Sequence, residues 1–198
     1  MSSDISKAFL RIQINPEHRD FCRFLWFTDA TMSKVRIFRF KVVLFGATCS
    51  PFLLNQTISH HLDLQTDSLS PQLKDAYYID NFQRIYQFVE DIIKEKPLIE
   101  STMLKGNMPL GKWTTNAPIN SIYQTKGDTD YLGLIWNTEF DEFRVKMPPD
   151  ISNAIKSTEK CCTKRKVVSL FATLYDPIGL LTPISLHGKI VHSEFMVN

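Results

Sequence analysis

The residues most suited to chemistry in this sequence are two aspartates and one asparagine. Asp80 and Asn81 stand next to each other in the stretch "YYIDN", directly after two aromatic residues and an isoleucine. Aromatic and aliphatic side chains bury well in a sheet, so we expect a tight turn that holds Asp80 at an exposed tip between two strands. Asp4, in "SSDISKAF", is the second acid that we expect to take part.

A pair of carboxylates brought together by folding predicts a bound divalent cation. Two carboxylates about 4 Å apart repel each other by roughly 4 kcal/mol at an effective dielectric constant of about 20, so a fold that pairs them usually holds a cation there. Mg²⁺ takes hard oxygen ligands, often one or two protein carboxylates together with substrate phosphates. Spacing alone does not join Asp4 to Asp80, and each acid taken singly is more typical of a cap or a turn.

The elements that must position these acids are read from the spacing of apolar residues. Residues 10–15 alternate between apolar and polar side chains, which predicts a half-buried strand. Aromatic and β-branched residues on both sides of the turn-like "TDATMSK" predict an antiparallel hairpin over about residues 21–46. The chain therefore opens with β structure.

Helices and further hairpins are expected beyond this point. Ser50 and Pro51 predict a helix start, followed by a buried stripe of Leu54, Ile58 and Leu62. A second helix is predicted over residues 85–96, ending near Lys96-Pro97, then a hairpin within residues 130–147 and two helices in the tail. This order, with short antiparallel connections, predicts an α+β fold.

Composition places the chain among ordinary globular proteins. Hydrophobic residues make up 43% and charged residues 22%, which argues against disorder. The net charge of +2 permits a polyanionic partner without requiring one, and a late basic cluster lies between Lys160 and Lys166. The four cysteines lack CxxC spacing, which predicts reduced thiols inside the cell, and we expect neither a signal peptide nor a membrane span.

Six sequence blocks in a fixed order resemble one known family over nearly the whole chain. That family is the reverse transcriptase, an RNA-directed DNA polymerase, of BEL/Pao-type LTR retrotransposons. The blocks are "DISKAFLRIQINPEHRDFCRFLWF", "FRFKVVLFGATCSPFLLNQTISHHL", "YYIDN", "MPLGKWTTN", "YLGLIWN" and "TKRKVVSLFATLYDPIGLLTPISLHGKI".

The resemblance implies a polymerase palm, an antiparallel sheet backed by helices, with part of the fingers. It places this palm at residues 1–147, with the predicted hairpin as fingers, and a helical thumb-like or connection-like segment at 148–198. It also implies that the chain is truncated at its N-terminus. By resemblance, Asp4, the carbonyl of Ile5 and Asp80 bind Mg²⁺ or Mn²⁺. Asn81 stands where such polymerases mostly carry a second aspartate, and it is similar to a variant within the BEL/Pao branch.

Further residues acquire expected roles from the same resemblance. Phe9, beside Ala8, matches the steric gate that excludes a ribose 2′-hydroxyl, and Lys112 matches the lysine that protonates the pyrophosphate leaving group. Gly46 and Ser50 match the loop and helix beneath the template and the incoming nucleotide, although this sequence has Leu44 where proline is usual. Tyr131, Leu132 and Gly133 match the primer-grip hairpin.

The implied partners are a primer-template of RNA or DNA, dNTPs and other parts of a Gag-Pol polyprotein, with no membrane. The implied location is intracellular and cytoplasmic, within a virus-like particle in the active element. A catalytically inactive remnant that binds nucleic acid or serves a structural role is the alternative hypothesis. An aspartic protease is excluded because "GDTDY" has Asp130 where its turn needs glycine, and residues 150–198 lack the several acids of an RNase H site.

Overall fold

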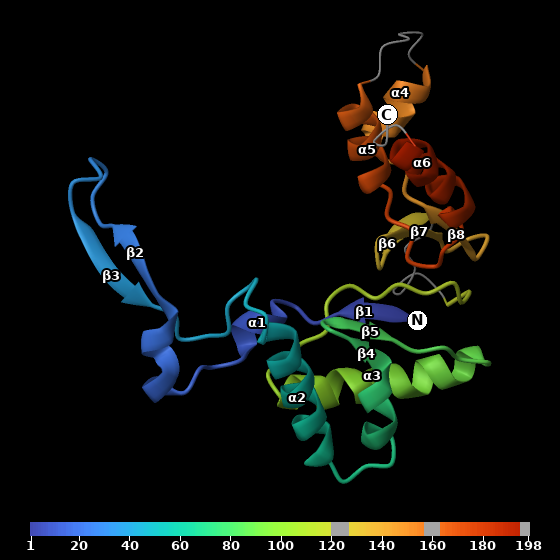
Figure 1. The fold of residues 1–198 in the computed structure, drawn as a ribbon. Coiled ribbons are helices and arrows are strands. Elements are labelled where there is room, and N and C mark those ends of the chain that lie inside the picture. Colours follow the sequence, from blue (N-terminus) through green and yellow to red (C-terminus); the bar gives the residue numbers. More distant parts are fainter. Residues whose placement is uncertain (120–126, 157–162, 195–198) are drawn as a thin grey trace. The chain divides into compact units, whose positions relative to one another are not determined.

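The structure is a computed structural model that describes residues 1–119, 127–156 and 163–194 (Figure 1). The chain divides into two compact units, residues 1–124 and residues 125–198. The predicted boundary of the palm between residues 147 and 148 stays a prediction. In the second unit, the hairpin turn at Gly133 packs against the ring of Tyr175, which joins the strands of this unit to the helices that follow them.

A small antiparallel sheet lies at the centre of the first unit. Strand β1 (Ser2–Asp4) pairs with β5 (Asn81–Gln83), and β5 pairs with β4 (Tyr77–Tyr78), in the order β1-β5-β4. The free edge of β1 is bonded to residues 109–114, where the amide and the carbonyl of Ser2 each bond Thr114 at 2.8 Å. Strand β1 is therefore held on both sides.

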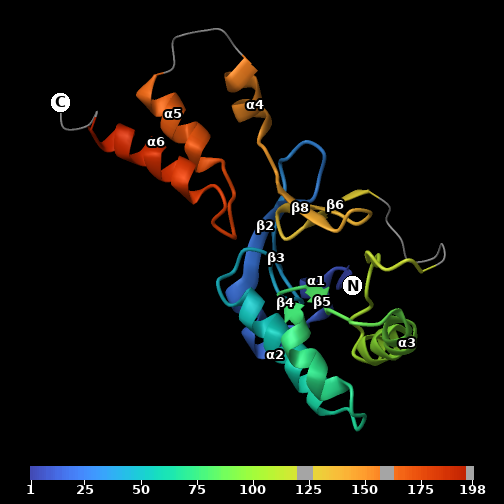
Figure 2. The same ribbon diagram turned by 90° about the vertical axis from the view of Figure 1, so that its right-hand side faces the viewer.

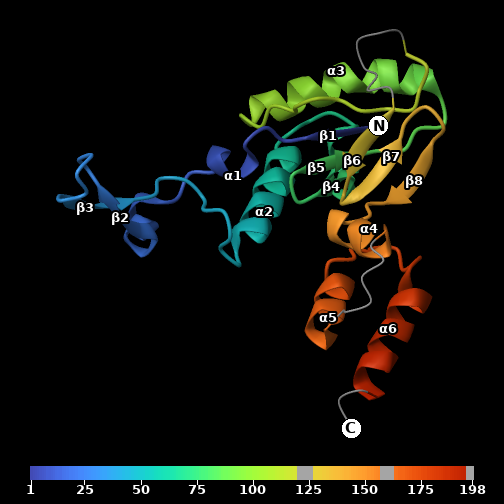
Figure 3. The same ribbon diagram turned by 90° about the horizontal axis from the view of Figure 1, so that it is seen from above.

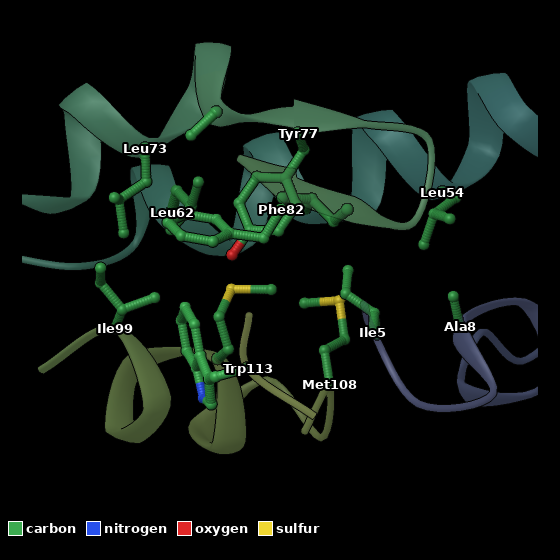
Figure 4. Close-up of a cluster of buried hydrophobic side chains, with 13 residues drawn as sticks. Ile5, Ala8, Leu54, Leu62, Leu73, Tyr77, Phe82, Ile99, Met108 and Trp113 are labelled. Atoms are coloured by element: carbon green, nitrogen blue, oxygen red, sulfur yellow. The ribbon is translucent and has the colours of Figure 1, made fainter. Parts of the chain in front are cut away.

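One face of this sheet is covered by helices, as Figure 1 and Figure 2 show. Phe82 of β5 is fully buried among residues of helix α2 (Ser50–Asp63), the 3₁₀ helix η2 (Ser70–Ala76) and helix α3 (Val89–Lys105). Figure 4 shows this cluster, which includes Ile5, Leu54, Leu62, Leu73, Tyr77, Ile99, Met108 and Trp113. Because strand residues alternate, Asp4 and its partner Asn81 point to the opposite face.

Helix α2 confirms the predicted stripe, since Leu54, Ile58 and Leu62 are 0%, 2% and 1% exposed. The predicted helix start at Ser50 is confirmed. The cap residue is Cys49, and the Ser50 hydroxyl donates to the carbonyl oxygen of Leu44 at 2.5 Å. Ser50 therefore fixes the preceding loop against the helix start.

Helix α3 differs from its prediction at both ends. It begins at Val89, leaving Ile85 98% exposed, and it continues through Pro97 to Lys105. A proline inside a helix removes one backbone hydrogen bond and costs about 3 kcal/mol. Burial of Ile99 and Met103, which are both fully enclosed, offsets that cost, because two large buried side chains each contribute about 1.5–3 kcal/mol.

The predicted strand over residues 10–15 is wrong. Residues 8–11 form the short helix α1 (Ala8–Arg11), and the residues after it make one isolated bridge, between Gln13 and Val42, instead of a strand. The helical turn buries Ala8 beside Ile5, at a spacing of three residues, and this packing outweighs the alternating pattern. The 3₁₀ helix η1 (Pro16–Cys22) follows, and the predicted hairpin is then confirmed as β2 (Arg23–Phe27) and β3 (Val35–Arg39).

The second unit combines a three-stranded antiparallel sheet with helices. Its strands are β6 (Asp128–Tyr131), β7 (Leu134–Asn137) and β8 (Glu142–Val145), in the order β6-β7-β8. Its helices are α4 (Pro149–Lys156), α5 (Lys164–Ala172) and α6 (Thr182–Glu194), so α4 adds to the two helices predicted in the tail. Among the described residues, no helix is long and apolar enough to cross a membrane.

Candidate metal and nucleotide site

The fold brings Asp4, the last residue of β1, next to Asp80, which lies in the turn directly before β5. Asp4 pairs with Asn81 in the register of β1 and β5, and the backbone amide of Ile5 donates to the carbonyl oxygen of Asp80 at 2.8 Å. The Asp4 side chain is exposed and that of Asp80 is half-buried. The two acids that the sequence singled out are therefore adjacent, on the side of the sheet that faces away from the core.

Asp80 lies in a strained two-residue turn between β4 and β5. The turn residues are Ile79 and Asp80, and Tyr78 pairs with Asn81 across them. Ile79 has a φ of 57°, an unusual value for a β-branched residue that costs on the order of 1–3 kcal/mol. Packing of Ile79 against the hydrophobic core holds the residue in this conformation and fixes the position of Asp80.

Asn81 orients the carboxylate beside it. Its side-chain amide donates to Oδ1 of Asp80 at 3.2 Å. A carboxylate oxygen has two acceptor positions, so this hydrogen bond leaves capacity on both oxygens of Asp80 for a cation. The amide thus acts on Asp80 as a hydrogen-bond donor, a function that an aspartate at this position would not provide.

Gly111 closes the other side of Asp4 and was missed in the sequence analysis. Its backbone amide donates to the carbonyl oxygen of Asp4 at 2.6 Å, and a Cβ atom added at Gly111 would lie only 2.5 Å from Oδ1 of Asp4. The signal that could have revealed it is a glycine directly before the predicted Lys112. Lys112 is exposed, and its position next to Gly111 brings a cationic residue to the same edge of β1.

The oxygen donors fit a hard divalent cation. The third predicted ligand is the carbonyl of Ile5, which accepts the amide of Ala8 at 3.2 Å and keeps a second lone pair. Within the described parts of the chain, no group of three or more His, Cys, Asp or Glu side chains could hold a metal ion. Mg²⁺ is commonly held by one or two carboxylates with waters and substrate phosphates, and its binding here stays a prediction.

Four predicted nucleotide-binding residues follow in the same unit. Phe9 is half-buried and its ring makes an edge-to-face contact with the ring of Phe45, with centroids 5.1 Å apart. Gly46 adopts a φ of 83° in open space, a conformation that favours glycine. Ala8 and Ser50 are buried, with 3% and 1% exposure, so their side chains serve packing, and substrate contact there stays a prediction.

The predicted primer-grip residues form a tight turn in the second unit. Leu132 and Gly133 have φ values of 48° and 84° and connect β6 to β7, the pattern of a type I′ hairpin turn. The ring of Tyr131 packs against Trp136 and Phe143, with centroids 5.5 Å and 5.3 Å away. Partial burial raises the pKa of the Tyr131 hydroxyl above its usual value.

Of the basic cluster at residues 160–166, only part lies among the described residues. Arg165 and Lys166 are exposed in the first turn of α5, whereas Lys160 lies outside the described residues. The amide of Lys166 is capped by the side chain of Thr163. The predicted contact of this cluster with template phosphate stays a prediction.

Comparison with known families gives one match. Residues 163–198 are similar to the family described as the Pao retrotransposon-like RNaseH-like domain. No curated protein matches the chain. The matched residues contain two acids, Asp176 and Glu194, and Oδ2 of Asp176 accepts the amide of Leu181 at 2.7 Å within a loop. The match names an RNaseH-like domain and not a reverse transcriptase, and it indicates a component of a BEL/Pao retrotransposon polyprotein.

Proposed function

We propose that this chain is a reverse-transcriptase palm of a BEL/Pao retrotransposon polyprotein that adds nucleotides from dNTPs to a primer 3′ end. The observation that carries the proposal is the adjacency of Asp4 and Asp80, joined by the hydrogen bond between the amide of Ile5 and the carbonyl of Asp80. The α+β arrangement, with an antiparallel sheet covered on one face by α2 and α3, supports the same proposal.

Asp4, Asp80 and the carbonyl of Ile5 would hold Mg²⁺ or Mn²⁺. When bound, such ions lower the pKa of an attacking hydroxyl and neutralise charge on the transferred phosphoryl group. The amide of Asn81 keeps the Asp80 carboxylate oriented. Lys112, at the outer edge of β1, would donate a proton to the departing pyrophosphate.

In this proposal, Phe9 discriminates between deoxyribose and ribose. Its ring is braced by the edge-to-face contact with Phe45, so it cannot retreat freely from a bound nucleotide. A fixed ring leaves no volume for an additional 2′-oxygen, which favours deoxynucleotides over ribonucleotides. A primer-template and dNTPs are the implied ligands, and other polyprotein segments are the implied partners.

A non-catalytic remnant is the second candidate, and the identity of residue 81 is the observation in its favour. Asn81 is neutral, whereas most polymerases of the resembled class carry an aspartate at this position. The missing negative charge beside Asp80 weakens the attraction of the site for cations. Such a protein would keep the sheet and bind nucleic acid without turnover. The nuclease chemistry of RNase H is not part of either proposal.

The test measures metal affinity and nucleotide incorporation on the same chain. Mn²⁺ binding is followed by paramagnetic resonance for the wild type, Asp80→Asn and the control Asp75→Asn, which removes an exposed acid in η2. We expect Asp80→Asn alone to lose binding and to abolish extension of a primed RNA template. Unchanged Mn²⁺ affinity in Asp80→Asn would refute the site, and Asp80-dependent metal binding without incorporation would support the remnant.

A further inference from the structure

The ribbon formed by β2 and β3 exposes apolar side chains on both faces. Figure 1 and Figure 3 show it as two strands that project from η1, and Arg39 of β3 bonds Asp20 of η1 at the base of the ribbon. The residues of β3 are all exposed, and so are four of the five in β2. Isolated two-stranded ribbons with large exposed apolar surfaces generally mark an interaction site.

The register sorts these side chains into two different faces. Paired residues share a face, and the pairs are Phe24 with Phe38, Trp26 with Arg36, and Leu25 with Ile37. One face, called the aromatic face below, carries Phe24, Trp26, Arg36, Phe38 and the following Phe40. The opposite face carries Leu25, Phe27, Val35 and Ile37.

Three rings of the aromatic face, those of Phe24, Phe38 and Phe40, lie in contact with one another. Phe24 and Phe38 are stacked with centroids 5.8 Å apart and an interplanar angle of 27°, and Phe24 lies 4.6 Å from Phe40. Trp26 is 64% exposed, next to an exposed Arg36 that has no ion-pair partner among the described residues. Rings and guanidinium planes are the groups on which unpaired nucleic-acid bases stack.

The positive charge of the ribbon favours a polyanion as its ligand. Residues 17–41 contain six Lys or Arg and three Asp or Glu, whereas the whole chain has a net charge of only +2. Asp20 binds Arg23 and Arg39, and these two arginines hold the pKa of its carboxyl below the usual range. Lys34, Arg36 and Lys41 remain exposed without ion-pair partners among the described residues, so the positive charge next to the rings is available.

We propose that the aromatic face of the β2–β3 ribbon binds single-stranded nucleic acid, with bases stacked on Trp26 and Phe38 and phosphates near Arg36. This site is separate from the two carboxylates, and it extends the proposed function by giving the unpaired part of a template its own contact. Its binding needs no metal ion. The two proposals can therefore fail independently.

The test uses the full chain with a fluorescein-labelled oligo(dT) in EDTA, followed by fluorescence anisotropy. Trp26→Ala combined with Phe38→Ala should weaken binding by at least about 10-fold, because each stacked base contributes roughly 1–3 kcal/mol. The control combines Leu25→Ala with Ile37→Ala on the opposite face, at positions with 67% and 66% exposure, and should bind like the wild type. Asp75→Asn, which removes an exposed acid in η2, should also bind like the wild type.

Two further measurements identify the kind of contact. Trp26 is far more exposed than Trp113 and Trp136, which are 8% and 6% exposed, so quenching of tryptophan emission by oligo(dT) should disappear in Trp26→Phe. Arg36→Ala should reduce the salt dependence of log K by about 0.7 per lost phosphate contact, and Arg36→Lys should retain it.

Three results would overturn this proposal. Equal affinity for a duplex of the same length would exclude stacking on unpaired bases. Equal loss in the two double variants would show that the ribbon acts through its apolar surface alone. Self-association in sedimentation that only the aromatic-face variant abolishes would identify a second copy of the chain as the ligand.

Discussion

The contact between Gly111 and Asp4 allows the candidate site to be perturbed without altering any of its ligands. In Gly111→Ala the new Cβ would lie 2.5 Å from Oδ1, 3.2 Å from Cγ and 3.4 Å from the backbone oxygen of Asp4. Gly111 does not have a positive φ, so alanine fits its backbone conformation. The effect of the substitution therefore comes from the collision with the carboxylate.

The magnitude follows from these distances. Ordinary van der Waals contact begins at about 3.5 Å, so Oδ1 must move by roughly 1 Å. A displacement of about 1 Å in a catalytic site costs on the order of 100-fold in rate. The fold should change little, because the Asp4 side chain is exposed and an altered rotamer costs only about 0.5–1.5 kcal/mol.

The assay compares Gly111→Ala with Gly106→Ala. The control also introduces a crowded methyl group, 2.8 Å from Cε of Met108 and 2.9 Å from the ring of His61, but away from Asp4. We expect Gly111→Ala to lower Mn²⁺ affinity at least about 10-fold and nucleotide incorporation by about 100-fold, with little change in the urea midpoint. Gly106→Ala should lower the midpoint and leave Mn²⁺ affinity unchanged.

If Gly111→Ala bound Mn²⁺ with wild-type affinity, the prediction would be refuted. Such a result would mean that metal binding does not depend on the position that the Asp4 carboxylate occupies beside Gly111. A parallel loss of metal affinity and stability in both variants would also refute it. In that case the loss would reflect unfolding and not displacement of one carboxylate.

Three further predictions test other parts of the structure. Asn81→Asp adds a carboxylate beside Asp80 and should raise Mn²⁺ affinity, and a decrease would show that the amide contact at 3.2 Å matters more than charge. Gly133→Ala forces a side chain into a φ of 84° and against Tyr175, and should destabilise the chain by about 1–2 kcal/mol in urea unfolding, whereas an unchanged midpoint would contradict this. Hydrogen bonds from Ser70, first its hydroxyl and then its amide, lower the pKa of Asp67. The resulting stabilisation should be present above the unfolded value of about 3.9 and lost as pH falls through the lower folded value, so Asp67→Asn should be less stable than the wild type at pH 7 and equally stable at low pH.

Local patterns in the sequence predicted helix α2 well and the length of α3 poorly. The stripe of Leu54, Ile58 and Leu62 recurs every four residues, so one turn of helix after another buries the same face. In α3 the local signal of Pro97 argues for a helix end. The helix continues past Pro97 because Ile99 and Met103 are buried in the core. This burial depends on elements that are distant in the sequence, so no local pattern reveals it.

The alternation over residues 10–15 was misleading for a related reason. Period-two spacing predicts a strand only if a neighbouring strand and a core lie alongside it. Here the core contact belongs to Ile5 and Ala8, just before the alternating residues, and the turn between them leads directly into helix α1. Leu10 is left 44% exposed as a result.

The candidate site was only partly accessible from the sequence. The turn at Asp80 follows from its flanking aromatic and aliphatic residues, and the β4–β5 hairpin confirms it. The pairing of Asp4 with that hairpin came from family resemblance, because no local pattern encodes a contact between segments so far apart. Gly111 was missed because its close approach to Asp4 arises only when residues 109–114 join the edge of β1.

The arrangement around β1 explains how so short a strand can fix a metal ligand. The backbone of Asp4 is bonded to Gly111 on one side, and the next residue, Ile5, is bonded to Asp80 on the other. Main-chain bonds on both sides fix the Cα position, while the exposed carboxylate keeps rotamer freedom for binding. Since Gly111 offers no side chain, the Asp4 carboxylate can occupy the volume next to it, so the identity of residue 111 controls the geometry of the site as directly as the acids do.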